Sequence, residues 1–71
     1  MDTKAIGRTL RELRGIRSIV DVCRDLDISP SSLSMYEHGE RIPRDDIKMR
    51  LAKYYGKSVT DIFFDEKVHS V

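Results

Sequence analysis

Residues 28–44, ISPSSLSMYEHGERIPR, carry side chains that are well suited to contacting another molecule. Serine hydroxyls donate and accept single hydrogen bonds, and guanidinium groups bind phosphate or carboxylate through parallel N–H groups. Leu33 and Tyr36 have the three-residue spacing of the buried side of a helix. The outward set is then polar apart from one proline and one methionine, and it comprises Pro30, Ser31, Ser32, Ser34, Met35 and His38.

Ser31 and Met35 are four residues apart, so they share one stripe of a helix. Serine is common near helix starts, so the serines alone fit a solvated face equally well. Met35 favours a contact surface, because it is an apolar side chain on an otherwise polar stripe.

Basic residues stand on both sides of this stretch. Arg41 and Arg44 come just after the helix that the stretch contains, while Arg17 and Ser18 open the preceding helix, whose free N–H groups suit a phosphate oxygen. We expect these four residues, with His38, to contact phosphates. Ordinary solvated charge is the alternative for each arginine.

Short helices must position these residues, because residues that typically start or end helices recur every ten to fifteen residues. The alternation of apolar and polar residues that marks a strand does not run through the chain. Ser18 with Asp21 forms a capping-box pattern, and Ser29 precedes a proline at a first helical position. The fold class predicted is all-α, with five helices over about residues 3–14, 19–26, 30–38, 44 or 45–55 and 60–64. We expect one domain over residues 1–64 and a polar tail over residues 65–71.

Composition excludes several other classes. Charged residues make up 35% of the chain and the formal net charge is +1, yet residues 1–17 hold five basic residues against two acidic ones. Cys23 is the only cysteine, which fits a reducing cytoplasm, and it cannot form an intrachain disulfide. His38 and His69 lack partners at metal-ligand spacing, so neither a metal nor a cofactor is expected.

No apolar run approaches the roughly 20 residues that a membrane span needs, and the N-terminus has no secretory signal. No Ser–His–acid set and no phosphate-cradling glycine loop occurs, so catalytic residues and an enzymatic role are not expected. No small-molecule ligand is evident either.

Three segments in this order, LRELR, ISPSSLSMYEHGERIP and LAKYYGKSVTDIF, resemble the lambda-repressor-like helix-turn-helix family, which includes the Cro-type and Xre-type regulators. The resemblance covers residues 6–64, and residues 36–64 are similar to small phage or mobile-element regulators of Gram-positive bacteria. It implies a five-helix domain in which the second and third helices form the helix-turn-helix. It also implies a cytoplasmic transcription regulator, more typically a repressor, that binds double-stranded DNA as a homodimer on a two-fold-related operator.

The resemblance also implies roles for single residues. Pro30, Ser31 and Met35 match the family's base-reading positions, and Ser32 and Ser34 complete that face. In a DNA major groove Met35 would pack on a thymine methyl group. Because this face has no Arg, Asn or Gln, we expect it to rely on methyl groups, water and duplex deformability. Arg14 and Glu37 match a structural ion pair of the family.

Other positions depart from the family or extend its pattern. Asp27 stands where the family often has glycine, and aspartate can adopt the left-handed conformation at some cost. Phe63 matches a core position, which leaves Phe64, with Val68, as an exposed anchor for a dimer interface. Two alternatives share this fold: a protein-binding adaptor or antitoxin, and a restriction-modification controller protein.

Overall fold

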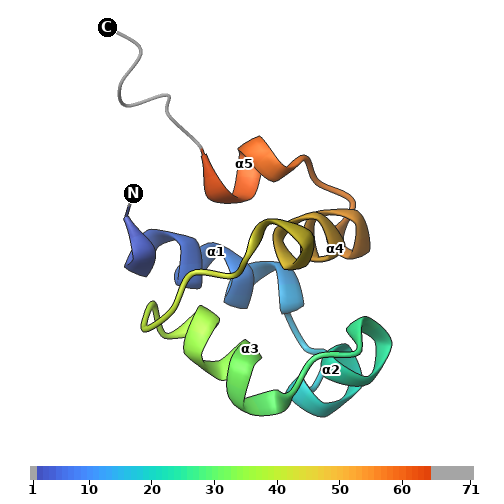
Figure 1. The fold of residues 1–71 in the computed structure, drawn as a ribbon. Coiled ribbons are helices and arrows are strands. Elements are labelled where there is room, and N and C mark those ends of the chain that lie inside the picture. The colour runs from blue at the N-terminus through green and yellow to red at the C-terminus, as the bar shows by residue number, and fades with distance from the viewer. Residues whose placement is uncertain (1, 65–71) are drawn as a thin grey trace, which may run out of the picture.

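The computed structural model describes residues 2–64 and contains helices but no strands over that range (Figure 1). The all-α, five-helix architecture predicted from the sequence is therefore confirmed. The helices are α1 (Thr3–Arg14), α2 (Ile19–Leu26), α3 (Pro30–Glu37), α4 (Asp45–Tyr55) and α5 (Val59–Phe63).

Serine side chains start three of the helices. The hydroxyls of Ser18, Ser29 and Ser58 each accept the backbone N–H three residues on, at 3.0–3.1 Å, which satisfies one of the unpaired donors of a first turn. Asp2 caps α1 in the same way by accepting two backbone N–H groups. Because Ser58 is itself the cap, α5 begins at Val59, one residue before the predicted start.

The turn inside the helix-turn-helix depends on a left-handed residue. Asp27 ends α2 with φ 58° and ψ 48°, as predicted from its place in the turn. The backbone N–H of Ile28 then donates to Cys23 O at 3.1 Å, which closes the last turn of α2. Gly39 closes α3 in the same manner with φ 73°, and there the N–H of Glu40 donates to Met35 O. These closures direct the chain sharply into and out of α3.

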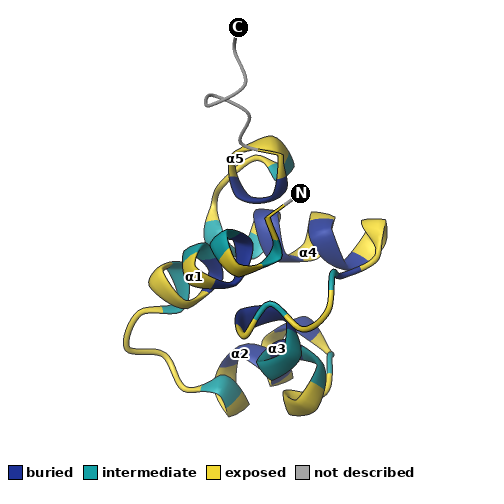
Figure 2. Ribbon diagram, turned by 90° about the vertical axis from the view of Figure 1, so that its left-hand side faces the viewer, coloured by how far each residue is buried: buried dark blue, intermediate teal, exposed yellow. Residues whose placement is uncertain are grey.

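The hydrophobic core takes side chains from all five helices. Within it α1 packs against α3 and α5, and α2 packs against α3 and α4, while α5 and α2 lie toward opposite ends of the molecule (Figure 1). Figure 2 shows the buried sides of the helices turned toward one another. Leu13, Ile19, Tyr54 and Tyr55 are only half-buried at the edge of the core. The buried hydrophobic residues are Ile6, Leu10, Val22, Cys23, Leu26, Leu33, Tyr36, Ile47, Leu51, Ala52, Ile62 and Phe63.

Candidate nucleic-acid interface

One side of α3 is buried and the other is open. Leu33, Tyr36 and Glu37 face the interior, because their spacing places them on one side of the helix. On the opposite side Ser31 is exposed, and Met35 is half-buried. This outer side is where the sequence placed the base-reading residues.

The five predicted base-reading residues do not form one uniform surface. Pro30 is exposed, and Ser34 is half-buried. Ser32 lies at the edge of the set, since its hydroxyl accepts a 2.9 Å hydrogen bond from the Ser29 hydroxyl and lines a neighbouring cleft. Ser31 and Met35 form the centre of the outer face.

His38 lies at the end of α3 with its ring folded back on the helix. Its Nδ1 lies 2.7 Å from the Ser34 carbonyl oxygen and 3.3 Å from the Ser34 hydroxyl. A carbonyl oxygen only accepts, so Nδ1 carries the proton and donates. The other ring nitrogen, Nε2, then donates to a phosphate only when the imidazole is doubly protonated.

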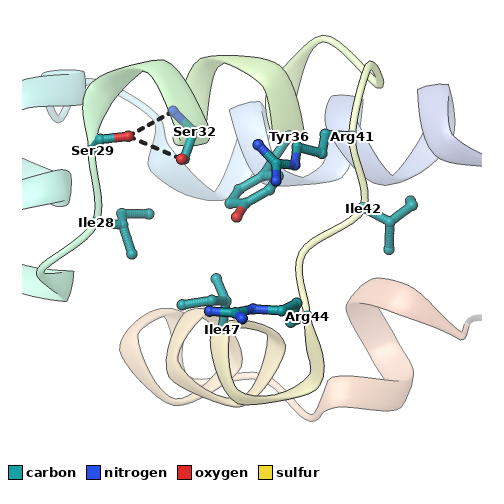
Figure 3. Close-up of a pocket in the computed structure, with 8 residues that line it drawn as sticks. All are labelled: Ile28, Ser29, Ser32, Tyr36, Arg41, Ile42, Arg44 and Ile47. Carbon is teal, nitrogen blue, oxygen red and sulfur yellow. Dashed lines mark hydrogen bonds between the residues drawn. The ribbon is translucent and has the colours of Figure 1, made fainter.

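A shallow cleft of about 360 Å³ separates α3 from the start of α4. Figure 3 shows Arg41 beside the Tyr36 ring on one side of the cleft and Arg44 beside Ile47 on the other. Both arginines are exposed, and the nearest carboxylate to Arg44, that of Asp46, is 4.0 Å away. An exposed pair at that distance contributes little, so both guanidinium groups are available to an anion.

Arg17 makes contacts that the sequence did not reveal. Its guanidinium carbon lies 5.4 Å from the ring centroid of Tyr54 and 5.7 Å from that of Tyr55, within the range of a cation–π interaction. The Tyr54 hydroxyl donates to Asp25 at 2.8 Å. The end of α4 is thereby joined both to the residue before the cap of α2 and to the last turn of α2. The adjacent tyrosines were the sequence signal, but nothing along the chain indicated their partner.

Arg14 and Glu37 join α1 to α3 through two parallel hydrogen bonds. Nε lies 2.7 Å from Oε2 and Nη2 lies 2.9 Å from Oε1. The Glu37 side chain is 2% exposed and that of Arg14 is 19% exposed. The hydrogen bond to this carboxylate is the largest cause of the raised pKa of Arg14, and it outweighs the opposing effect of burial.

Two further contacts hold the C-terminal end of α3 against α1, and sequence reasoning missed both. Arg11 Nη1 donates to the Glu37 carbonyl oxygen at 2.9 Å. A Cβ atom at Gly7 would overlap that same oxygen, so only glycine permits this approach of the two backbones. The glycine inside a predicted helix was the available signal.

The region proposed for dimer contact is only partly described. Phe63 is 3% exposed, in agreement with its predicted core position, whereas Phe64 is 36% exposed. The ammonium group of Lys48, a buried residue, lies 4.7 Å from the Phe64 ring centroid. Val68 lies outside the described residues, as does the predicted tail.

Three further observations concern metal binding, thiol chemistry and membrane crossing. Residues 2–64 contain no group of three or more side chains that could hold a metal ion. Burial raises the pKa of the Cys23 thiol, which disfavours the reactive thiolate. Within the same residues no helix combines the length and apolar character that crossing a bilayer requires.

Comparison with known proteins identifies the family. A family model described as helix-turn-helix matches residues 8–62, which include all of α2, α3 and α4. Comparisons with curated proteins and with solved structures returned no match. Since the family model spans well over half of the chain, the protein belongs to the Cro/C1-type helix-turn-helix family of DNA-binding regulators.

Proposed function

We propose that the protein is a sequence-specific transcriptional repressor of the cytoplasm that binds a two-fold-related operator as a homodimer, with α3 in the major groove. One observation carries the proposal. α3 is fixed to the domain by its buried side, while Ser31 is exposed and Met35 half-buried on the other side. A rigidly supported helix with an open polar face is what base reading in a major groove requires.

Base recognition would centre on Ser31 and Met35. The Ser31 hydroxyl can donate or accept one hydrogen bond, and the Met35 side chain can pack on a thymine methyl group. The Ser34 hydroxyl lies within hydrogen-bond distance of His38 Nδ1, so we expect Ser34 to contribute less to base recognition than Ser31 does. Few bidentate contacts are available, and we therefore attribute part of the specificity to operator deformability.

Affinity would come from phosphate contacts around α3. Arg41 and Arg44 lie on either side of the cleft beside α3. Arg17 and Ser18 stand at the start of α2, where free N–H groups attract a phosphate oxygen. His38 joins this set in its protonated form.

The test is selection of bound sequences from random duplex DNA, followed by titration of the recovered sequence at several salt concentrations. We expect one enriched motif with two-fold symmetry and an affinity that falls steeply as salt rises. A protein-binding adaptor built on the same fold would enrich no motif and would bind no duplex even at low salt. That result would overturn the proposal.

Repression is tested separately by a reporter gene placed behind a promoter that contains the selected motif. Expression of the wild-type protein should lower reporter output, because a bound dimer occupies the DNA that the polymerase needs. Higher output would show an activator instead.

Dimerisation is proposed to involve Phe64, which is partly exposed and lies over Lys48. Phe64→Asp should shift the protein toward monomer in sedimentation velocity measurements. Val20→Asp is the matched control, since Val20 is 63% exposed on α2 and α2 lies at the other end of the molecule from α5 (Figure 1). Equal sedimentation of the Phe64→Asp variant and the wild type would refute this interface.

A further inference from the structure

The first helix carries a stripe of basic residues that the proposed contacts do not use. Lys4, Arg8 and Arg11 are spaced four and three residues apart, so they lie along one side of α1, and all three are exposed. None of the ion pairs found between residues 2–64 involves them. The stripe therefore presents three positive charges toward solvent.

The acidic residues near this stripe do not neutralise it. The carboxylate of Asp2 accepts the backbone N–H groups of Lys4 and Ala5 as the cap of α1. Glu12 is four residues from Arg8 but forms no ion pair with it. Much of the basic excess of residues 1–17 is thus concentrated on this side of α1.

The stripe borders the C-terminal end of α3. Arg11 donates to the carbonyl oxygen of Glu37, the last residue of α3. A Cβ atom at Gly39 would lie 3.1 Å from the Cα of Lys4, so the start of α1 touches the turn that follows α3. The two ends of the stripe are therefore fixed beside this end of the helix.

A phosphate backbone is the partner that this position fits. α3 has eight residues and is therefore about 12 Å long, close to the roughly 12 Å width of the major groove. A helix lying in the groove thus ends near sugar–phosphate backbone. The C-terminal end of a helix carries partial negative charge, which repels phosphate unless cations cover it.

We propose that Lys4, Arg8 and Arg11 form a second phosphate-binding surface, which holds the backbone of the bound duplex beside the C-terminal end of α3. This inference rests on the proposed function, because it places α3 in the groove. The partner is duplex DNA recognised through its phosphates, so the surface adds affinity without sequence preference.

The experiment compares two double variants that remove equal charge. Lys4→Gln/Arg8→Gln changes the stripe and leaves Arg11, which also holds α3, intact. Lys53→Gln/Lys57→Gln is the matched control, because both lysines are exposed and lie at the end of α4 and in the turn to α5, away from α3 (Figures 1 and 2). Binding to one selected duplex is measured between about 50 and 200 mM salt.

We expect the slope of log Kobs against log salt to fall in magnitude by about 0.9 per lost contact, or about 1.8 for the stripe variant. The control should keep the wild-type slope. Both variants should have the melting temperature of the wild type, and their preference for the selected sequence over other DNA should not change.

Two results would overturn the inference about the stripe. One is a wild-type slope in Lys4→Gln/Arg8→Gln, and the other is an equal loss of slope in the control, which would indicate a general effect of net charge. In both cases the wild-type protein still binds DNA and the proposed function survives. A wild-type protein that binds no duplex would instead refute the proposed function and the stripe together.

Discussion

Removal of Arg14 should destabilise the domain rather than change its sequence preference. Its guanidinium forms two hydrogen bonds to Glu37, and Nη1 donates a third to the Arg17 carbonyl oxygen at 2.9 Å. In Arg14→Ala the Glu37 carboxylate, 2% exposed, loses its only cationic partner among the described residues. A buried charge without a partner is among the most costly defects in a folded protein.

The size of the effect follows from burial. Loss of one partner from a buried ion pair costs about 3–5 kcal/mol. We expect about 3 kcal/mol, because Arg14 is 19% exposed and water can partly reach the vacated position. A chain of 71 residues has a free energy of unfolding of about 4–11 kcal/mol. The melting temperature should fall by about 12–24 °C, at about 4–8 °C for each kcal/mol.

Thermal unfolding followed by circular dichroism measures this loss, and DNA binding is titrated well below the lower melting temperature. Arg14→Lys keeps the charge without the parallel N–H groups, so its loss should be smaller. Arg14→Met/Glu37→Met leaves no buried charge and should recover much of the stability. An Arg14→Ala variant with unchanged melting but lost DNA binding would refute the structural role of the pair.

Three further outcomes follow from single contacts. Gly7→Ala should lower the melting temperature, although alanine normally favours a helix, because a Cβ would overlap the Glu37 carbonyl oxygen. Gly56→Ala should lower the melting temperature by less, since Gly56 has open space around it although its φ is 69°. A larger loss for Gly56→Ala than for Gly7→Ala would contradict the close α1–α3 contact. Burial, with a smaller effect of the Glu37 charge, raises the pKa of Tyr55 from 10.0 to about 12. The folded protein therefore holds the Tyr55 proton more tightly than the unfolded chain does. The neutral phenol contributes its full stability below pH 10, and this contribution to the free energy of unfolding is lost as pH rises through about 12. Tyr55→Phe, which removes a buried hydroxyl without a partner among the described residues, should melt no lower at pH 7 and should lose less stability in alkali, as measured by denaturant titration at each pH. When the operator thymines are replaced by uracil one at a time, the replacement at the thymine that contacts Met35 should raise the Kd of the wild type by about fourfold. This corresponds to about 0.8 kcal/mol for a buried methyl group. Met35→Ala should lose that sensitivity, and equal sensitivity in both proteins would contradict the contact.

The helices could be predicted because their signals are local. Ser29 and Pro30 specify the start of α3 within a few residues of chain, and Ser18 does the same for α2. The start of α5 was predicted one residue late, because Ser58 caps this helix and Val59 directly follows that cap.

The contacts that fix α3 could not be predicted in this way, because they join residues far apart in the sequence. The Arg14–Glu37 pair was expected from the family resemblance and not from any spacing. The contacts of Gly7 and Arg11 with the last carbonyl of α3, and of Arg17 with the α4 tyrosines, depend on the angles between helices. Those angles follow from packing of the whole core, which no local pattern encodes.

Sequence selection measures directly whether the outer face of α3 reads base edges. Selection from random DNA is carried out in parallel with the wild type, with Ser31→Ala/Met35→Ala and with Lys53→Ala as an exposed control. We expect an altered or weakened motif for the α3 variant only, at unchanged melting temperature. The same motif, recovered at the same strength by all three proteins, would contradict it.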